Sequence, residues 1–150
     1  MSRKNAREDT FRIIFQSLIN TLETDEYLID YFQALEEGES DGAFLNKPVG
    51  NDNEYVRKTV EGVLEKKAEL DKIISENLVG WNFDRISKVS VAAMRLALFE
   101  IMYGDDVPLK VAVNEAVEIS KKYDGEQCAS FVNGALGSAV KKMGINSDDK

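Results

Sequence analysis

The chain has 150 residues, of which 43% are hydrophobic, and carries a formal net charge of −8. This length suits one domain, or two small subdomains that share a core, and allows the chain to bury roughly 70% of its unfolded surface. No apolar run approaches the roughly 18 residues of a membrane span, and the N-terminus lacks the apolar segment of a signal peptide. We therefore expect a cytoplasmic protein with no membrane partner.

Two residue counts exclude most kinds of catalysis. The sequence contains no histidine and a single cysteine, Cys128. The commonest general base, most zinc sites and any internal disulfide are thereby removed. Cys128 falls on an apolar helical stripe, where a free cysteine usually serves as a small core residue. We expect no catalytic residue, no metal site and no cofactor, so the protein should not be an enzyme.

The acidity is concentrated in one segment. Residues 23–54 hold ten acidic residues and one lysine, a net charge of −9, whereas residues 1–22 carry +2 and residues 55–150 carry −1. An acidic protein is an unusual ligand for nucleic acid, because phosphate binding normally requires a basic surface. The uneven distribution keeps that function open for the rest of the chain, above all for its basic N-terminus.

Apolar residues recur at three- and four-residue steps along most of the chain, which predicts an all-α fold. Helices are expected over about 11–22 and 24–38. Residues 39–53 are rich in Gly, Asp and Asn and show no period, so they predict a mobile loop. We treat the acidic helix and loop over 23–54 as a variable segment.

The second half of the chain predicts the core of the bundle. The stripe from Val56 to Leu78 predicts one helix of about seven turns, ended by Gly80. After a turn over 82–87, residues 91–103 are apolar on nearly every side, as in a helix at the middle of a bundle. Its charged residues, Arg95 and Glu100, would need a partner or a route to the surface.

Two further helices complete the expected fold. Pro108 suits a helix start, where its missing N–H costs no hydrogen bond. Asp124 and Gly125 then interrupt the periodic pattern, and the last helix is expected over about 126–143. Lys121 and Lys122 would end the earlier of these helices, where cations interact favourably with the helix dipole.

The basic N-terminus is the first candidate for nucleic-acid recognition. Arg3 and Arg7 lie one helical turn apart and Lys4 is adjacent. Together they could present three cations to a phosphate backbone. The alternative is a solubilising tail.

The last predicted helix holds the second candidate. Phe131 lies at the margin of its apolar stripe, and Gln127 precedes it by one turn, further toward solvent. Single-stranded RNA is often held in this way, with a ring stacked on a base and an amide bonded to a base edge. The alternative for Phe131 is a core position.

Five segments, taken in order, resemble the NusB transcription antitermination family. They are R-K-N-A-R-E (3–8), W-N-F-D-R-I (81–86), A-A-M-R-L-A-L-F-E-I (92–101), V-P-L-K-V-A-V-N-E-A-V-E-I-S-K-K-Y (107–123) and F-V-N-G-A-L (131–136). The resemblance implies a compact bundle of about seven helices in two three-helix subdomains. Residues 1–150 would then form a single NusB-like domain that binds RNA and protein.

The resemblance also implies a function. The protein would bind boxA-type single-stranded RNA together with the small-subunit ribosomal protein Nus factor E. That complex would join the RNA polymerase antitermination complex and support transcription of ribosomal RNA. The residues implied on the RNA side are Arg3, Lys4, Arg7, Gln127 and Phe131, with Lys121 and Lys122 as neighbouring candidates; those on the partner side are Phe15 and Ser90.

Departures from the family pattern qualify this expectation. Asn5 interrupts what is often a longer arginine run, and Ser90 stands where an acidic residue is common. Fewer phosphate contacts mean weaker binding with a flatter salt dependence, so the isolated chain should bind RNA weakly. Two alternatives remain open. One is an RNA-positioning domain that works with a separate RNA methyltransferase, and the other is a homo-oligomeric helical protein, in the simplest case a homodimer.

Overall fold

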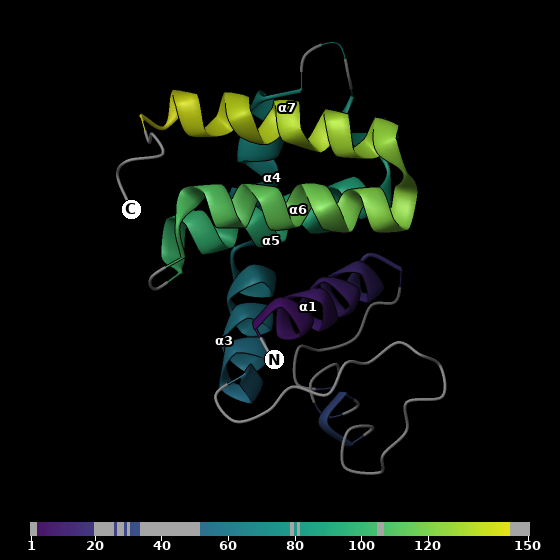
Figure 1. The fold of residues 1–150 in the computed structure, drawn as a ribbon, viewed down its shortest axis with the longest axis vertical. Helices are drawn as coiled ribbons and strands as arrows, with labels where there is room; N and C mark the ends of the chain where they lie inside the picture. Colours follow the sequence, from purple (N-terminus) through teal and green to yellow (C-terminus); the bar gives the residue numbers. More distant parts are fainter. Residues whose placement is uncertain are drawn as a thin grey trace. The chain divides into compact units, whose positions relative to one another are not determined.

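The structure, a computed structural model, describes residues 3–19, 26, 29, 31–33, 52–78, 80, 82–104 and 107–144. Its helices are α1 (Arg3–Ser17), α3 (Asp52–Glu65), α4 (Lys67–Glu76), the short 3-10 helix η1 (Phe83–Arg85), α5 (Lys88–Tyr103), α6 (Leu109–Asp124) and α7 (Glu126–Lys142) (Figure 1). The described residues contain no strand, and the predicted all-α class is confirmed. The helix predicted over 24–38 and the loop over 39–53 fall mostly outside the described residues.

Within the described ranges, no helix combines the length and the apolar character that a membrane crossing requires.

The chain divides into two compact units, residues 1–65 and 66–150. The boundary corrects one prediction, because the expected seven-turn helix is in fact two helices. Lys66 separates α3 from α4 with φ −98° and ψ 11°, outside the helical region. Glu65, Lys66 and Lys67 are all good helix formers, so local propensity gives no reason for a break here. The division between the two units coincides with it.

Helix α4 also ends earlier than Gly80. Its last residue is Glu76, and the buried Asn77 follows as the C-cap. The Asn77 side-chain nitrogen donates to the Ile73 carbonyl at 2.8 Å, and its oxygen accepts from the Ser138 hydroxyl of α7 at 2.7 Å. This one amide both closes α4 and attaches its end to α7, which apolar periodicity could not indicate.

In the first unit, α1 packs against α3 (Figure 1). The apolar cluster at this contact also takes in Tyr31 of the 31–33 segment, and its buried members are Ala6, Ile13, Tyr31, Val56 and Val60. Helix α1 begins at Arg3, eight residues before the predicted apolar stripe. The basic N-terminal segment is therefore helical.

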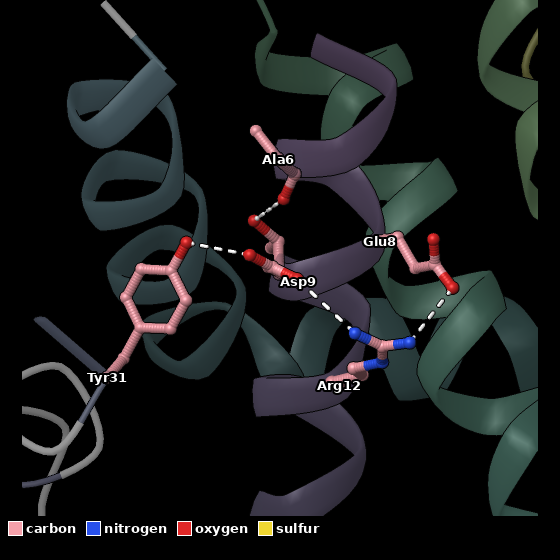
Figure 2. Close-up of polar contacts among 6 residues, drawn as sticks. Ala6, Glu8, Asp9, Arg12 and Tyr31 are labelled. Atoms are coloured by element: carbon pink, nitrogen blue, oxygen red, sulfur yellow. Dashed lines mark hydrogen bonds and ion pairs between the residues drawn. The ribbon is translucent and has the colours of Figure 1, made fainter. Parts of the chain in front are cut away.

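A buried carboxyl group anchors α1 to the segment at residues 31–33. Asp9 is fully buried, and one of its oxygens accepts a hydrogen bond from the Tyr31 hydroxyl at 2.9 Å. Its other oxygen lies 3.5 Å from the Arg12 guanidinium, which also reaches Glu8 at 3.2 Å (Figure 2). Buried polar groups are tolerated when they are hydrogen-bonded. Asp9 thus fixes a long-range contact within the first unit.

Helix α5 is the centre of the second unit. Every residue from Ser90 to Ile101 is buried, and α5 packs against α4, α6 and α7. This confirms the prediction of a helix enclosed on all sides. The Arg95 guanidinium donates from Nε and Nη2 to the two carboxylate oxygens of Asp71 on α4, at 2.8 and 2.7 Å. The partner that a buried arginine requires is therefore an acidic residue of the neighbouring helix.

Helices α6 and α7 begin and end close to their predicted limits. Pro108 precedes the first residue of α6 as its N-cap. Gly125 joins α6 to α7 with φ 92°, a conformation that glycine adopts without the steric cost paid by other residues. Because a single residue connects the two helices, the C-terminal turn of α6 is directly followed by the first turn of α7.

The enclosure of α5 yields a prediction for stability. Leu98 is 1% exposed, and Leu98→Ala should lower the free energy of unfolding by about 2–5 kcal/mol through loss of apolar contacts and formation of a cavity. Urea denaturation followed by circular dichroism measures this. Val111→Ala on α6, where the side chain is 39% exposed, is the control and should change stability by less than about 0.5 kcal/mol. A loss below about 1 kcal/mol for Leu98→Ala would contradict the central position of α5.

The Asp9 contact yields a second prediction. Tyr31→Phe keeps the ring but removes the hydroxyl that donates to the buried carboxyl group. We expect a loss of about 1–3 kcal/mol in the free energy of unfolding. Tyr123→Phe, at an exposed tyrosine of α6, is the matched control and should change stability by less than about 0.5 kcal/mol. A loss in Tyr31→Phe no larger than that in the control would mean that the Tyr31 hydroxyl adds little to the fold.

Candidate nucleic-acid interface

The first group of candidate residues lies on the first two turns of α1. Arg3 and Lys4 are exposed, whereas Arg7, one turn further on, is only 5% exposed. The three cations of the predicted basic segment therefore differ in what they can offer a ligand. Arg3 and Lys4 present charge at the surface, and Arg7 is largely enclosed by protein.

An aromatic residue of α3 joins this group. The guanidinium carbon of Arg3 lies 4.4 Å from the centroid of the Tyr55 ring, and that of Arg7 lies 5.8 Å from it. Both distances are within the range of cation–π attraction. Tyr55 could not be identified from the sequence, because nothing in the spacing of residues so far apart in the chain indicates that they meet.

The second group lies where α6 passes into α7. Lys121 and Lys122 occupy the last turn of α6, as predicted, and both are exposed. Gln127 is exposed on the first turn of α7, and Phe131 follows one turn later as a half-buried side chain. The single-residue connection at Gly125 brings two cations, an amide and an aromatic ring into consecutive turns.

An ion pair crosses this connection. Lys121 Nζ lies 3.4 Å from a carboxylate oxygen of Glu126, with the two side chains 53% and 81% exposed. Exposed pairs of this kind contribute at most about 1 kcal/mol. The Lys121 ammonium group can therefore exchange Glu126 for a phosphate at little cost.

The exposure of Phe131 is intermediate between that of a core residue and that of a ring fully available for stacking on a base. Its neighbour Val132 is fully buried, and most other apolar residues of the α7 stripe are buried as well. Phe131 is neither enclosed in this way nor fully exposed. A half-buried ring keeps its orientation through packing while part of its surface stays available to a ligand.

The two candidate partner residues have different environments. Ser90 is 3% exposed. Its hydroxyl lies 3.0 Å from the Ser87 hydroxyl and 3.1 Å from the Cys128 sulfur, which connects α5 to α7. Ser90 offers a partner almost no surface, whereas Phe15 is half-buried and its ring stacks on that of Phe11 with centroids 6.1 Å apart. Cys128 is buried, as predicted for a core residue.

The candidate residues are thus distributed over both units. Arg3, Lys4, Arg7 and Phe15 belong to the first unit, and Ser90, Lys121, Lys122, Gln127 and Phe131 to the second. In the part of the chain that the structure describes, no three side chains of the types that bind metals gather into a metal-binding group. The chemistry offered by the candidate residues is charge, hydrogen bonding and stacking.

Comparisons with known proteins give a consistent result. The family model described as the NusB family matches residues 4–141. The transcription antitermination protein NusB of Clostridium novyi is 36% identical over 141 residues, which cover 94% of this chain and 99% of that protein.

Solved structures share the fold. NusB of T. maritima has a TM-score of 0.77 and 30% identity, with 95% of this chain and 92% of that chain covered. A crystal structure of the antitermination factors NusB and NusE in complex with dsRNA contains a chain with a TM-score of 0.77 and 25% identity, with 93% and 96% covered. The all-helical fold expected from the sequence is therefore that of known NusB structures.

Proposed function

Because the chain belongs to the NusB family of transcription antitermination proteins, we propose that it binds boxA-type single-stranded RNA together with Nus factor E. In this proposal the complex joins RNA polymerase in the cytoplasm and supports transcription of ribosomal RNA. The chain is a transcription antitermination protein and not an enzyme. The observation that carries the RNA and NusE parts of the proposal is the similarity, over 93% of this chain, to a NusB chain solved with NusE and dsRNA. The preference for single-stranded boxA RNA is the part that the family resemblance implies.

The described side chains support two kinds of RNA contact. Arg3, Lys4, Lys121 and Lys122 are exposed cations that suit phosphate oxygens. Gln127 and Phe131 suit an unpaired base, through its edge and its face respectively. Phosphate contacts supply affinity without sequence information, and base contacts supply the discrimination.

The net charge of −8 supports a role for the protein partner. RNA is repelled at long range by an acidic protein, so non-specific binding by the chain alone should be weak. A second protein that contributes its own contacts to the same RNA raises the affinity of the assembly without requiring a basic surface here.

The test measures RNA affinity with and without the partner. Fluorescence anisotropy of a labelled boxA RNA should give a lower Kd when Nus factor E is present. A scrambled single strand of the same length and composition serves as the control for sequence. Equal affinity for boxA and scrambled RNA, with the partner present, would overturn the proposal.

Light scattering on the free chain and on the mixture tests the homo-oligomer alternative, which requires self-association that the partner leaves unchanged.

The exposed cations of α1 yield a prediction. Arg3 and Lys4 changed together to Ala should weaken RNA binding, with little change in melting temperature because both side chains are exposed. Each lost phosphate contact flattens the log–log salt dependence by about 0.7 for single strands, so the loss of two should flatten it by about 1.4. The control changes two exposed lysines of α4, Lys67 and Lys72, to Ala. An unaltered salt slope in the α1 variant would remove these residues from the RNA surface.

Phe131 yields the other prediction. If its ring stacks on a base, Phe131→Ala should lose about 1–3 kcal/mol of RNA binding. Stability should fall by less than the roughly 3–5 kcal/mol of a buried Phe truncation. Val132→Ala, at the buried neighbour, is the control and should lower stability while the folded protein keeps its RNA affinity. A large stability loss in Phe131→Ala with unchanged RNA affinity would leave Phe131 as a packing residue.

A further inference from the structure

Tyr55 of α3 contacts the basic end of α1 in a way that the proposed RNA residues do not explain. Its ring lies 4.4 Å from the Arg3 guanidinium carbon and 5.8 Å from that of Arg7. The ring is half-buried and packs against the apolar cluster of the first unit. Packing therefore holds the ring in place, and two cations gather around it.

The placement of these cations is electrostatically unfavourable for the helix. The N-terminus of a helix carries a partial positive charge, so cations in the first turn oppose the dipole. Arg3 is the first residue of α1, and the first turn contains no acidic residue to compensate. Like charges one turn apart also repel each other. The negative face of an aromatic ring offsets both effects, because it attracts a cation without neutralising it.

Arg3 and Arg7 have different surroundings although they approach the same ring. Arg7 is 5% exposed, so protein atoms restrict its side chain on most sides. Arg3 is exposed, and a long side chain at the start of a helix loses considerable rotamer freedom when it binds a ligand. A guanidinium over a ring can still donate from the N–H groups at its edge. The Tyr55 contact is therefore compatible with phosphate binding by Arg3.

We propose that Tyr55 is a positioning residue for RNA binding: its ring holds the Arg3 guanidinium in place on the first turn of α1, so that less side-chain freedom is lost when a phosphate binds. The inference rests on the proposed RNA binding. It assigns Tyr55 to the orientation of Arg3 and gives the ring no contact with RNA of its own. The ring face, rather than the hydroxyl group, is what the role requires.

The experiment compares Tyr55→Phe with Tyr55→Leu in the full chain, with boxA RNA and Nus factor E. Tyr55→Phe keeps the ring face and should bind RNA as the wild type does. Tyr55→Leu keeps apolar bulk but loses the face, and should weaken binding by about 2- to 5-fold, the equivalent of an exposed cation–π contact. Tyr103→Leu is the matched control, because Tyr103 is an exposed tyrosine whose ring also lies near a cation, Lys66.

A double-mutant comparison with Arg3 distinguishes a positioning role of Tyr55 from a general effect on stability. If Tyr55 acts through Arg3, the double variant Arg3→Ala with Tyr55→Leu should bind no more weakly than Arg3→Ala alone. Fully additive losses would overturn the inference, because the ring would then act independently of Arg3, either on RNA directly or through the fold. A loss in Tyr55→Phe as large as that in Tyr55→Leu would overturn it as well, since the hydroxyl would be the acting group.

A second measurement distinguishes failure of this inference from failure of the proposed function. The heteronuclear NOE of the Arg3 Nε–H reports the order of that side chain on the fast timescale without any RNA. Tyr55→Leu should lower it, and Tyr55→Phe and Tyr103→Leu should not. Unchanged order in Tyr55→Leu would overturn the positioning role even if RNA binds. A wild-type chain that shows ordered Arg3 and binds no boxA RNA with Nus factor E would overturn the proposed function instead.

Discussion

The burial of α5 from Ser90 to Ile101 is the constraint on which the second unit depends. A helix enclosed from Ser90 to Ile101 must find a partner for each of its polar groups inside the protein. Arg95 meets this requirement with both oxygens of Asp71 on α4, and Ser90 with Ser87 and Cys128. These bonds have defined directions, unlike apolar contacts, so they fix how α4 and α7 pack against α5. The α6–α7 connection with its candidate RNA residues is built on that arrangement.

The two groups of cations stand in opposite relations to their helices. Lys121 and Lys122 end α6, where positive charge stabilises the helix whatever else it binds. Arg3 and Lys4 begin α1, where positive charge opposes the dipole. Stability of the helix can therefore explain the lysines of α6 but not the cations of α1. The position of the α1 cations in their helix therefore calls for an explanation outside the helix dipole, and the Tyr55 ring over Arg3 supplies part of it.

Periodicity predicted the elements whose burial is one-sided or complete, such as α5 and the stripe of α7 with Cys128 and Val132. Glycine chemistry likewise predicted the junction at Gly125, whose φ is 92°.

Pairwise contacts could not be predicted in this way. Arg95 clearly needed a partner, yet the acidic residues of the chain are numerous and nothing marked Asp71. The break at Lys66 was missed because its neighbours favour a helix. Roles for Phe15 and Ser90 came from the family resemblance alone, whereas Gln127 and Phe131 were also indicated by their positions on the last helix. The burial of Ser90 could not be deduced from its residue type.

The acidity of the chain bears on specificity as well as affinity. Non-specific RNA binding comes almost entirely from phosphate contacts and counterion release. A protein of net charge −8 gains little binding free energy from this electrostatic contribution. Whatever affinity it has must come from a few local cations and from base contacts such as those suited to Gln127 and Phe131. Weak non-specific attraction then favours specificity, because RNA sequences that lack the base contacts lose a larger share of their affinity than the cognate sequence does. Under the proposed function, dependence on a second protein follows from the same balance, since the partner would supply the missing affinity only where both proteins contact one RNA.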